Sequence, residues 1–440
     1  MRRHALQHCC SILALVLSVT ACGLSEPVES EKTDVSLAGQ TVAVAGPWSG
    51  GEREKFQKVL DAFSEKTGAK TEYISTGQNV SSVISAAIAG GHAPDVVMVP
   101  QVGVLKQFAK RGWLTPLSEQ AHRGVDAKFA RVWQEQGSVD DVLYGVYFKA
   151  THKSMVWYDP GVLAKAGLKQ PRTWTEMLNV GHVLAEFGLA AVSVAGKDGW
   201  TLTDWFENIY LSQAGPEKYD ALAARELKWT DRSVIEALAT LGRLFSDTEL
   251  LAGGPKAALN ADLPGSVGKV FGPNPEAGLV YEGDFVAGIA KEQFNRNIGK
   301  EVQFFPFPAV GRGYPPVISG GDAAVVLKDG KNSKTGMRLV EYLTTYDAAA
   351  VWAKEGGFIS PNISLSFDNY KDSVARTTAE SLIGAVDRVR FDMSDQAPAD
   401  FGGTEGKGEW KLLQDFLRSP SDPETTAAKL EAAAAEGLKP

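Results

Sequence analysis

Cysteine is scarce in this chain, with three among 440 residues. Cys9 and Cys10 lie in an apolar N-terminal stretch and Cys22 follows it, so the rest of the chain has none. This excludes disulfides, a thiol nucleophile and a cysteine-based metal site from the part after Cys22. A chain of this length does not need disulfides, because it can bury a large hydrophobic core.

Positive charge is also in short supply. The 45 Lys and Arg residues are outnumbered by 53 Asp and Glu residues, which gives a formal net charge of −8. Binding to a phosphate backbone requires a basic face, so we expect no nucleic-acid partner.

Familiar catalytic motifs are missing as well. There is no Gly-x-Ser-x-Gly nucleophile elbow, and the glycine-lysine step at 406–407 lacks the spacing and the hydroxyl residue of a P-loop. No pair of histidines has the spacing of metal ligands. We therefore predict a protein that is not an enzyme and has neither cofactor nor metal.

The residues that are present begin with a stretch typical of an export signal. Arg2 and Arg3 precede an apolar run at 11–19 that is too short to cross a bilayer. Val-Thr-Ala-Cys at 19–22 resembles a lipoprotein signal, in which Cys22 carries the lipid. We expect a signal peptide over 1–21 and a flexible tether over 22–38, with the protein held outside the cytoplasm by its lipid. An ordinary signal peptide with an incidental cysteine is the alternative.

After the tether, strand and helix patterns alternate. The apolar residues Phe56, Val59, Leu60 and Phe63 share one helix face, and Val83 is expected to point inward from the next helix. This β-α order predicts a parallel sheet, whose ligands bind beyond the carboxyl ends of its strands. The predicted strands are 41–45, 69–74 and 96–99, and the predicted helices are 51–68, 80–88 and 102–112.

The stretch at 143–160 divides the chain. It reads Leu-Tyr-Gly-Val-Tyr-Phe-Lys-Ala-Thr-His-Lys-Ser-Met-Val-Trp-Tyr-Asp-Pro, and its β-branched and aromatic residues have no helical period. We expect extended chain that leaves one lobe and enters the next, with Asp159 and Pro160 starting a new helix. Clefts between domains are where small ligands bind, so a binding site is expected at this crossing.

Together with Pro-Arg-Thr-Trp-Thr-Glu at 171–176, this stretch resembles the first lobe crossing of the carbohydrate solute-binding proteins (family 1 class) of ABC importers. It is most similar to their α-glucoside-type branch, and the resemblance covers nearly the whole chain after the leader. It implies an α/β fold of the periplasmic-binding-protein type, in which three hinge crossings join two lobes. It also implies a sugar ligand, an α-glucoside or short oligosaccharide held by hinge closure, and a membrane permease with a separate ATPase as partners.

The expected division places 39–149 and 320–356 in lobe one, and 150–319 and 357–440 in lobe two. The second crossing is expected at 317–327 and the third at 356–362. The Gly- and Pro-rich segment 252–275 is predicted to be an exposed, partly ordered excursion. We expect the protein to be a monomer.

A sugar site needs aromatic platforms and planar polar groups that donate and accept hydrogen bonds. Residues of this kind lie at predicted strand ends, loops and crossings, and the resemblance implies contacts near several of them. Trp48 could instead cap the core, Gln78 could cap a helix, and one of the two tryptophans at 200 and 205 is expected to be structural. The candidate ligand-binding residues are Trp48, Glu52, Gln78, Gln101, Lys149, Trp200, Asp204, Trp205, Glu282, Asp284, Asp322, Phe358, Asn362, Asp392 and Asp395.

Two other functions stay open at this point. Carboxylate pairs are plentiful, which allows a secreted glycoside hydrolase. A surface lipoprotein that binds another protein would carry an exposed apolar patch. The spread of cleft-type residues over both lobes favours small-molecule binding.

Overall fold

The structure is a computed structural model that describes residues 36–385 and 388–437. The chain divides into two units, Met1–Val35 and Ser36–Pro440, and only the second is described below. The predicted signal peptide, Cys22 and nearly all of the predicted tether lie outside the described residues. None of the described helices is long and apolar enough to cross a membrane.

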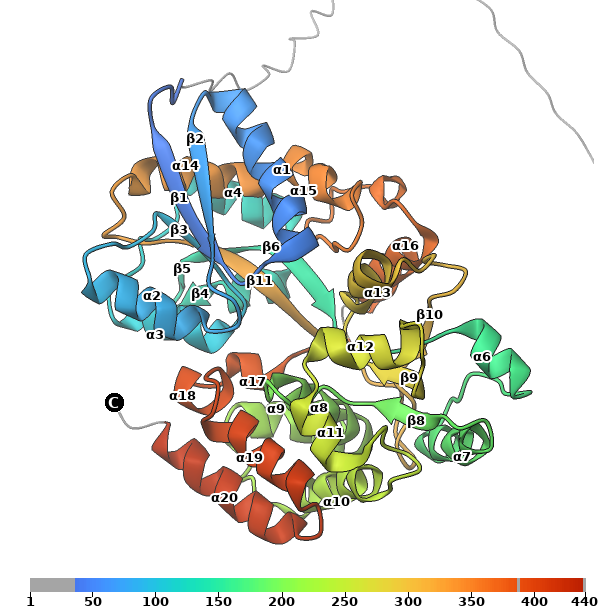
Figure 1. The fold of residues 1–440 in the computed structure, drawn as a ribbon. Coiled ribbons are helices and arrows are strands. Elements are labelled where there is room, and N and C mark those ends of the chain that lie inside the picture. Colours follow the sequence, from blue (N-terminus) through green and yellow to red (C-terminus); the bar gives the residue numbers. More distant parts are fainter. Residues whose placement is uncertain (1–35, 386–387, 438–440) are drawn as a thin grey trace, which may run out of the picture. The chain divides into compact units, whose positions relative to one another are not determined.

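Lobe one is built on a six-stranded sheet with the order β12-β11-β3-β1-β2, in which β6 pairs with the other edge of β11 (Figure 1). β1 is parallel to β2 and β3, as the sequence predicted, while β11 runs antiparallel to β3 and β6. The strands are β1 Thr41–Gly46, β2 Lys70–Ser75, β3 Val96–Val99, β6 Gly145–His152, β11 Ile318–Val326 and β12 Arg390–Phe391, with a separate hairpin of β4 Ser138–Val139 and β5 Val142–Leu143.

Helices cover this sheet and share its hydrophobic core. In the first of them, the four predicted core residues Phe56, Val59, Leu60 and Phe63 are buried, and Gly68 ends the helix in the left-handed conformation. The helices are α1 Gly50–Thr67, α2 Val80–Ala89, α3 Val102–Lys110, α4 Glu119–Lys128, α5 Arg131–Gln136, α14 Ser333–Leu343, α15 Tyr346–Ala353, the 3₁₀ turn η1 Phe367–Asn369 and α16 Ser373–Gly384.

Lobe two has a four-stranded sheet with the order β10-β7-β9-β8, in which β8 and β9 are parallel and the other pairs antiparallel. Two separate hydrophobic clusters pack against it. Its strands are β7 Met155–Tyr158, β8 Ala190–Ser193, β9 Ala277–Tyr281 and β10 Gln303–Pro306. The remaining helices are α6 Pro160–Lys165, α7 Trp174–Ala185, α8 Trp200–Ala214, α9 Pro216–Ala223, α10 Arg232–Ser246, α11 Gly254–Asn260, α12 Leu263–Phe271, α13 Val286–Phe294, α17 Met393–Gln396, α18 Ala399–Gly402, α19 Gly408–Arg418 and α20 Pro423–Glu436.

The predicted first crossing is confirmed. β6 belongs to the larger sheet and β7, three residues later, to the smaller one. Asp159 then caps α6 by accepting a hydrogen bond from the Gly161 N–H, and Pro160 occupies its first turn. β11 covers the predicted second crossing and pairs with β6 along most of its length. The two crossing strands therefore lie side by side.

The C-terminal part differs from the predicted division. Phe358, Tyr370, Ala379 and Leu382 are buried in the lobe-one core, although 357–440 was expected to belong to lobe two. Phe358 stacks on Trp352 with ring centroids 5.2 Å apart. Val374 of α16 packs in one lobe-two cluster, and after β12 the chain enters the other, where α19 and α20 pack beside α10 (Figure 1).

Two local predictions are wrong. The segment 252–275 is not an exposed excursion, because it forms α11 and α12 and buries Val267, Val270 and Phe271. Pro255 and Pro264 lie in the first turns of these helices, where the missing N–H costs nothing, and Pro273 and Pro275 follow α12. Val83 is 41% exposed, because α2 buries only a narrow stripe through Val80 and Ile84.

Candidate ligand-binding cleft

A cleft of about 330 Å³ separates residues of the two lobes. Lobe one contributes the loop after β1, the start of α1 and the crossing strands β6 and β11. Lobe two contributes the first turns of α8, α12 and α19 and one side of α13. The volume is at the lower end of the range for small-molecule sites, about 300–1,000 Å³.

The crossing strand β6 supplies polar side chains to this cleft at every second position. Lys149 and Thr151 of β6 and Lys153 just after it all line the cleft. Side chains of a strand alternate between its two faces, so the residues between them point the other way. Phe148 accordingly lies in the lobe-one core, and the His152 ring is buried.

Lys149 is the centre of the lobe-one side. Its Nζ lies 2.5 Å from Glu52 Oε1 and 5.9 Å and 5.7 Å from the ring centroids of Trp48 and Trp352. Burial alone would lower the pKa of Lys149, but the carboxylates of Glu52 and Asp322 outweigh it and raise that pKa. Lys149 therefore stays charged under two aromatic rings.

Lys153 is the centre of the cleft floor. Its Nζ lies 2.6 Å from Asp392 Oδ2, 3.2 Å from Asp395 Oδ2 and 3.4 Å from Asp204 Oδ1. We refer to these four residues as the Lys153 cluster. All are at least nine-tenths buried, and only Lys153 and Asp395 line the cleft. The cluster joins the first crossing to α8 and α17.

The position of Asp395 is fixed by the backbone of α17. Asp392 caps this helix, and its Oδ1 accepts a hydrogen bond from the Asp395 N–H at 2.8 Å. Glu207 of α8 accepts hydrogen bonds from the N–H groups of Met393 and Ser394 at 2.7 and 2.8 Å. α17 is thereby held against α8, with Asp395 turned toward the cleft.

The three carboxyl groups of the Lys153 cluster have different affinities for protons. Burial, followed by the charge of Asp392, raises the pKa of Asp395 to about 7. Burial also raises the pKa of Asp204 well above its usual value. Burial would do the same for Asp392, but Lys153 and several hydrogen bonds lower its pKa to about 2. Asp392 is therefore the permanent counter-ion of Lys153, and Asp395 is ionised only near neutral pH and above.

An aromatic wall from lobe two faces this floor. Trp200 at the start of α8 lies with its ring 5.8 Å from Lys153 Nζ and edge-to-face with Phe285, and Trp410 of α19 lines the same side. The indole Nε1 atoms of both tryptophans are buried and have no hydrogen-bond partner among the described residues. Two donors on large apolar rings are thus available to a ligand.

The predicted site residues fall into three groups. Two groups lie away from the cleft surface: Asp204, Glu282, Asp284 and Asp392 are buried directly behind it, and Trp205, Phe358 and Asn362 belong to the packed interior. The residues that line the cleft are Trp48, Glu52, Gln78, Gln101, Lys149, Trp200, Asp322 and Asp395.

The three interior residues have structural contacts instead. Trp205 packs edge-to-face on Tyr281 with ring centroids 4.5 Å apart, so Trp200 is the tryptophan of this pair that lines the cleft. The Asn362 side chain donates to the Thr344 carbonyl oxygen and accepts from the Ser364 N–H. It shapes a lobe-one segment, so the third crossing predicted at 356–362 is wrong. Trp205, Phe358 and Asn362 were predicted to bind the ligand, but they do not line the cleft.

Sequence reasoning missed Lys153, Thr203, Ser394 and Trp410, all of which line the cleft. Lys153 had a usable signal, because it follows Lys149 by four residues in an extended stretch and therefore shares its face. Trp410 had none, since it is brought to the cleft by the packing of α19 on α8.

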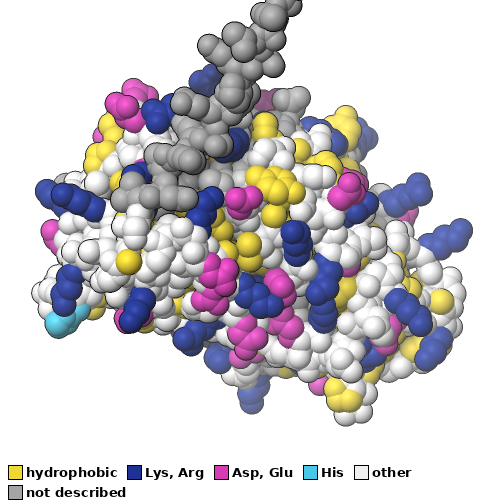
Figure 2. All heavy atoms as spheres, turned by 90° about the horizontal axis from the view of Figure 1, so that it is seen from above, with side chains coloured by type: hydrophobic (Ala, Val, Ile, Leu, Met, Phe, Trp, Pro, Cys, Tyr) yellow, Lys and Arg dark blue, Asp and Glu magenta, His cyan; other side chains and the backbone are white. Residues whose placement is uncertain are grey.

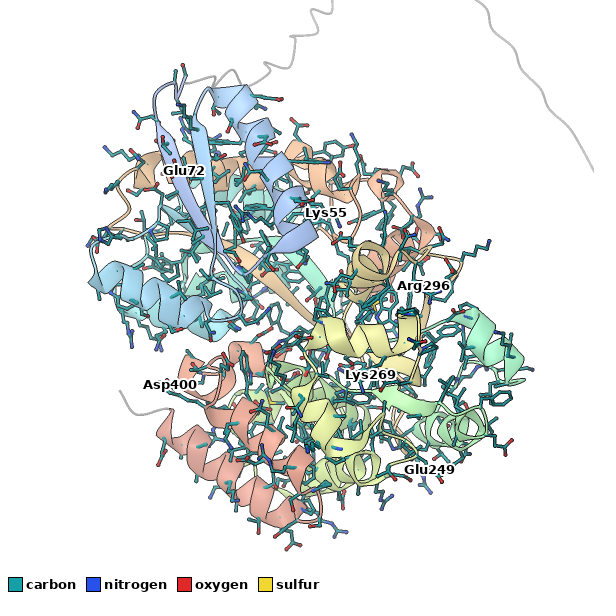
Figure 3. All side chains as sticks on the ribbon, in the orientation of Figure 1. Lys55, Glu72, Glu249, Lys269, Arg296 and Asp400 are labelled. Carbon is teal, nitrogen blue, oxygen red and sulfur yellow. The ribbon has the colours of Figure 1, made fainter. Side chains whose placement is uncertain are left out.

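Two polar contacts join the lobes at the margins of the cleft. Lys55 of α1, labelled in Figure 3, forms an ion pair of 2.7 Å with Glu292 of α13. Asn79, the N-cap of α2, donates to Glu405 at 3.1 Å. The lobes are therefore in direct contact on both sides of the cleft.

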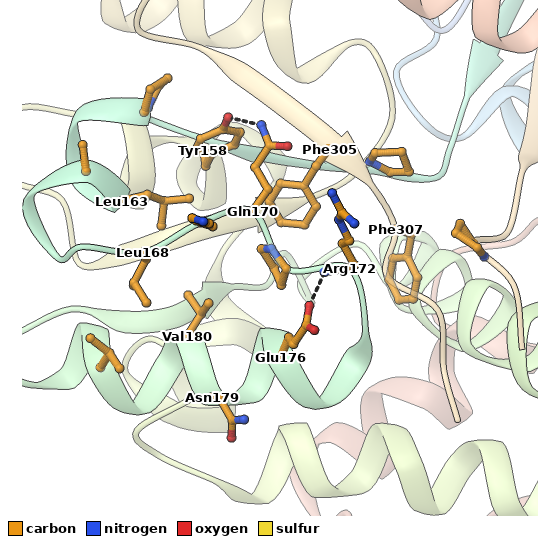
Figure 4. Close-up of a pocket in the computed structure, with 17 residues that line it drawn as sticks. Tyr158, Leu163, Leu168, Gln170, Arg172, Glu176, Asn179, Val180, Phe305 and Phe307 are labelled. Atoms are coloured by element: carbon orange, nitrogen blue, oxygen red, sulfur yellow. Dashed lines mark hydrogen bonds between the residues drawn. The ribbon is translucent and has the colours of Figure 1, made fainter. Parts of the chain in front are cut away.

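A larger cavity, about 1,220 Å³, lies within lobe two beside α6, α7 and β10 (Figure 4). Prolines and apolar side chains make up most of its lining. Gln170 donates to the Tyr158 hydroxyl, and Glu176 accepts from the Arg172 N–H at 2.7 Å. Its walls come from lobe two alone, so the inter-lobe cleft is the better candidate for a ligand that both lobes contact.

The outer surface has mixed charge. On the face drawn in Figure 2, lysine and arginine side chains are interspersed with aspartate and glutamate. This face therefore has no basic patch of the kind that a nucleic-acid backbone requires.

The sequence has characterised relatives over most of its length. It is 29% identical to the osmoprotective compounds-binding protein GgtB of Synechocystis sp. over 86% of this chain and 88% of that protein. It is 28% identical to the α-glucosides-binding periplasmic protein AglE of Rhizobium meliloti over 91% of this chain and 88% of that protein.

Solved structures share the fold at low sequence identity. The bacterial solute receptor AcbH, described as preferring β-D-galactopyranose, aligns with a TM-score of 0.78 at 19% identity, over 91% of this chain and all of AcbH. Maltose-bound MalE3 of T. maritima aligns with a TM-score of 0.73 at 17% identity, over 90% of this chain and all of MalE3. The two-lobe architecture predicted from the sequence is thus confirmed.

The sequence profile of the bacterial extracellular solute-binding proteins matches residues 49–350, which include both crossing strands and most of the cleft lining. The chain belongs to the family of bacterial extracellular solute-binding proteins.

Proposed function

We propose that this protein binds a sugar in the inter-lobe cleft and delivers it to an ABC importer. The observation that carries the proposal is the make-up of the cleft, to which each lobe contributes both aromatic rings and hydrogen-bonding groups. Trp48 and Lys149 come from lobe one, and Trp200 and Trp410 from lobe two. A ligand that contacts both sides stabilises the closed form by its preference for that form.

The chemistry of the lining suits a polyhydroxylated ligand. A sugar has apolar C–H faces that can lie against the Trp200 and Trp410 rings, and hydroxyl groups that accept from their free indole N–H groups. The Asp322 and Asp395 carboxyl groups can accept hydrogen bonds from sugar hydroxyls. An apolar ligand would leave these buried groups unpaired, at about 1–3 kcal/mol each.

The names of the relatives support an α-glucoside or short oligosaccharide as the sugar. AglE is an α-glucosides-binding protein, and the solved structures include one with bound maltose and one with bound raffinose. The name of GgtB, an osmoprotective compounds-binding protein, supports a small polar solute. Membership of the extracellular solute-binding family supports a separate membrane permease and ATPase as the partners in transport.

Lipid attachment at Cys22 forms a further part of the proposal. The Val-Thr-Ala-Cys sequence supports it, and a lipid there would hold a monomeric receptor at the cell envelope. Radiolabelled palmitate should enter the full-length protein in its native host, and the Cys22→Ala protein should remain unlabelled. Equal labelling of both proteins would contradict the assignment.

Isothermal titration calorimetry tests the binding function directly. Maltose, trehalose, sucrose and raffinose are titrated into the protein, and the same mixtures are then analysed for released monosaccharide. We expect saturable binding of at least one sugar with no hydrolysis. Hydrolysis would favour a glycoside hydrolase instead, and the absence of binding to every sugar would reject the α-glucoside assignment.

A further inference from the structure

The acids that line the cleft outnumber the lysines that line it, so not every acid has a lysine partner of its own. Lys149 is paired with Glu52 and Lys55 with Glu292. The lining acids that remain are Asp198, Asp322 and Asp395, and the remaining lysine, Lys153, is shared between Asp395 and two acids behind the floor, Asp204 and Asp392. Negative groups are therefore in excess on the cleft surface.

The layer behind the floor is rich in acids, but burial raises the pKa of Asp204, Glu207, Glu282 and Glu409, so the excess of negative charge belongs to the cleft lining. The members of this layer are buried carboxyl groups, and no lysine or arginine other than Lys153 contacts them among the described residues. His152, also buried there, is uncharged at neutral pH because burial lowers its pKa to about 4. Neither carboxyl oxygen of Glu282 has a hydrogen-bond partner in residues 36–385 and 388–437. The acids of this layer are Asp204, Glu207, Glu282, Asp392 and Glu409.

Several polar atoms converge at one point of the floor. A Cβ placed on Gly320 of β11 would lie 3.1 Å from Asp395 Oδ2, from Thr151 Oγ1 and from the Lys153 Cε. Within the part of the chain that the structure describes, Thr151 Oγ1 is buried and has no hydrogen-bond partner, and Trp410 Nε1 on the facing wall has none either. Unpartnered groups of this kind, aimed into a cleft, indicate a site built for a polar ligand.

We propose, building on the sugar-binding function, that Asp395 makes the cleft select its sugar by charge. A sugar with a protonated amine binds more tightly than its neutral counterpart, and a sugar with a carboxylate binds more weakly than that counterpart. The amine would form a charge-assisted hydrogen bond with the Asp395 carboxylate, which is about twice as strong as a neutral hydrogen bond. A carboxylate would add a like charge to an enclosed floor that already has an excess of acids.

Calorimetry with matched ligands tests this proposal at low salt and about pH 8, where the Asp395 carboxyl group is ionised. The probes are maltose, trehalose and sucrose, each compared with the forms in which one C6 carries an amine or a carboxylate. For whichever sugar binds, we expect the amine form to bind about tenfold more tightly and the carboxylate form about tenfold more weakly. Equal affinities for the three forms, or the reverse order, would overturn the proposal while leaving sugar binding in place.

The Asp395→Asn variant assigns the effect to one residue. It removes the charge but keeps the size, and Lys153 keeps Asp204 and Asp392 as partners, so the fold should persist. We expect the three forms of the sugar to bind this variant within about twofold of one another. Asp126→Asn is the control, because Asp126 is exposed on α4 outside the cleft and its substitution changes the net charge equally.

Three outcomes would show which part of the proposal is wrong. Undiminished charge selectivity in Asp395→Asn would overturn the role of Asp395, and loss of selectivity in Asp126→Asn would point to the general field of the protein. No binding by any probe, neutral or charged, would reject the underlying sugar-binding function as well. Circular dichroism melting of each variant shows whether it is folded in the titration.

Discussion

Lys153 Nζ lies 2.6 Å from Asp392 Oδ2 although the two residues are 239 positions apart in the chain. This ion pair joins the first crossing to the N-cap of α17, and Asp204 and Asp395 complete its surroundings. A single lysine therefore holds together segments that belong to different parts of the sequence.

Replacement of Lys153 by methionine should destabilise the protein strongly. It keeps most of the side-chain volume but leaves Asp392 as a buried charge without its partner. Breaking a buried pair in this way costs about 3–5 kcal/mol. Urea denaturation measures the change in the free energy of unfolding. Lys218→Met is the control, because its ion pair with Asp231 lies at the surface and is worth about 1 kcal/mol or less. Similar losses in the two variants would contradict the importance of the cluster.

Alanine substitution of the two tryptophans in the N-terminal half of α8 should affect different properties, sugar affinity in one case and stability in the other. Trp200→Ala removes a ring that lines the cleft, so sugar affinity should fall by about tenfold with little loss of stability. Trp205→Ala empties a fully buried position and should lower the free energy of unfolding by about 3–5 kcal/mol. Calorimetry and urea denaturation of both variants give the four values. The reverse pattern would mean that the two rings have been assigned to the wrong roles.

Stability should depend on pH through the buried carboxyl groups. Burial raises the pKa of Asp284 and Asp322 to about 6 and that of Asp395 to about 7. A carboxyl in the unfolded chain has a pKa near 3.9, so the folded form binds more protons between about pH 4 and pH 7. The stabilisation is complete at low pH and is lost as pH rises through each folded-state pKa. His152 has the opposite effect. Its ring is neutral in the folded protein but takes up a proton in the unfolded chain below about pH 6.5, so it lowers stability as pH falls below that value.

Asp395→Asn isolates one part of this pH dependence. Between about pH 5 and pH 8 the variant should lose less stability than the parent protein, with slopes that differ by at most about 1.4 kcal/mol per pH unit. Urea denaturation across this range measures both slopes. Parallel curves for the two proteins would show that Asp395 does not take up a proton on folding.

The ion pair between Lys55 and Glu292 should slow the release of bound sugar. Lys55→Met removes a contact that exists only when α1 and α13 meet, so release should become about twofold to fivefold faster. Stopped-flow tryptophan fluorescence measures the rate. Lys58→Met is a matched control on the same helix, because Lys58 pairs with Glu355 within lobe one. Equal acceleration in both variants would argue against a contribution from the inter-lobe contact.

The sequence was sufficient to predict the parts of the fold that depend on local periodicity. The parallel pairing of β1 with β2 and β3 followed from alternating strand and helix patterns, and the passage from β6 to β7 followed from one extended stretch. The prediction for the segment 252–275 was wrong because its prolines were taken as loop residues, although proline is also favourable in the first turn of a helix.

The candidate site was only partly predictable, for a physical reason. A polar residue near a strand end can lie on the cleft surface or one layer behind it, and sequence spacing does not distinguish these depths. Asp322 in the middle of β11 and Asp284 just after β9 were both predicted to bind the ligand. Only Asp322 lines the cleft, since Asp284 accepts a hydrogen bond from the His152 backbone N–H. Contacts such as those of Lys153 join distant segments, so they become visible only after the chain has folded.

The alternation along β6 also limits how this protein can change. A deletion or insertion of one residue between Lys149 and Lys153 would exchange the two faces of the strand, so that core side chains would enter the cavity and lysines would enter the hydrophobic interior. Natural variants with a new preference should therefore keep the length of this strand and differ at alternate positions along it. The loops that line the rim are free of this restriction and can vary in length.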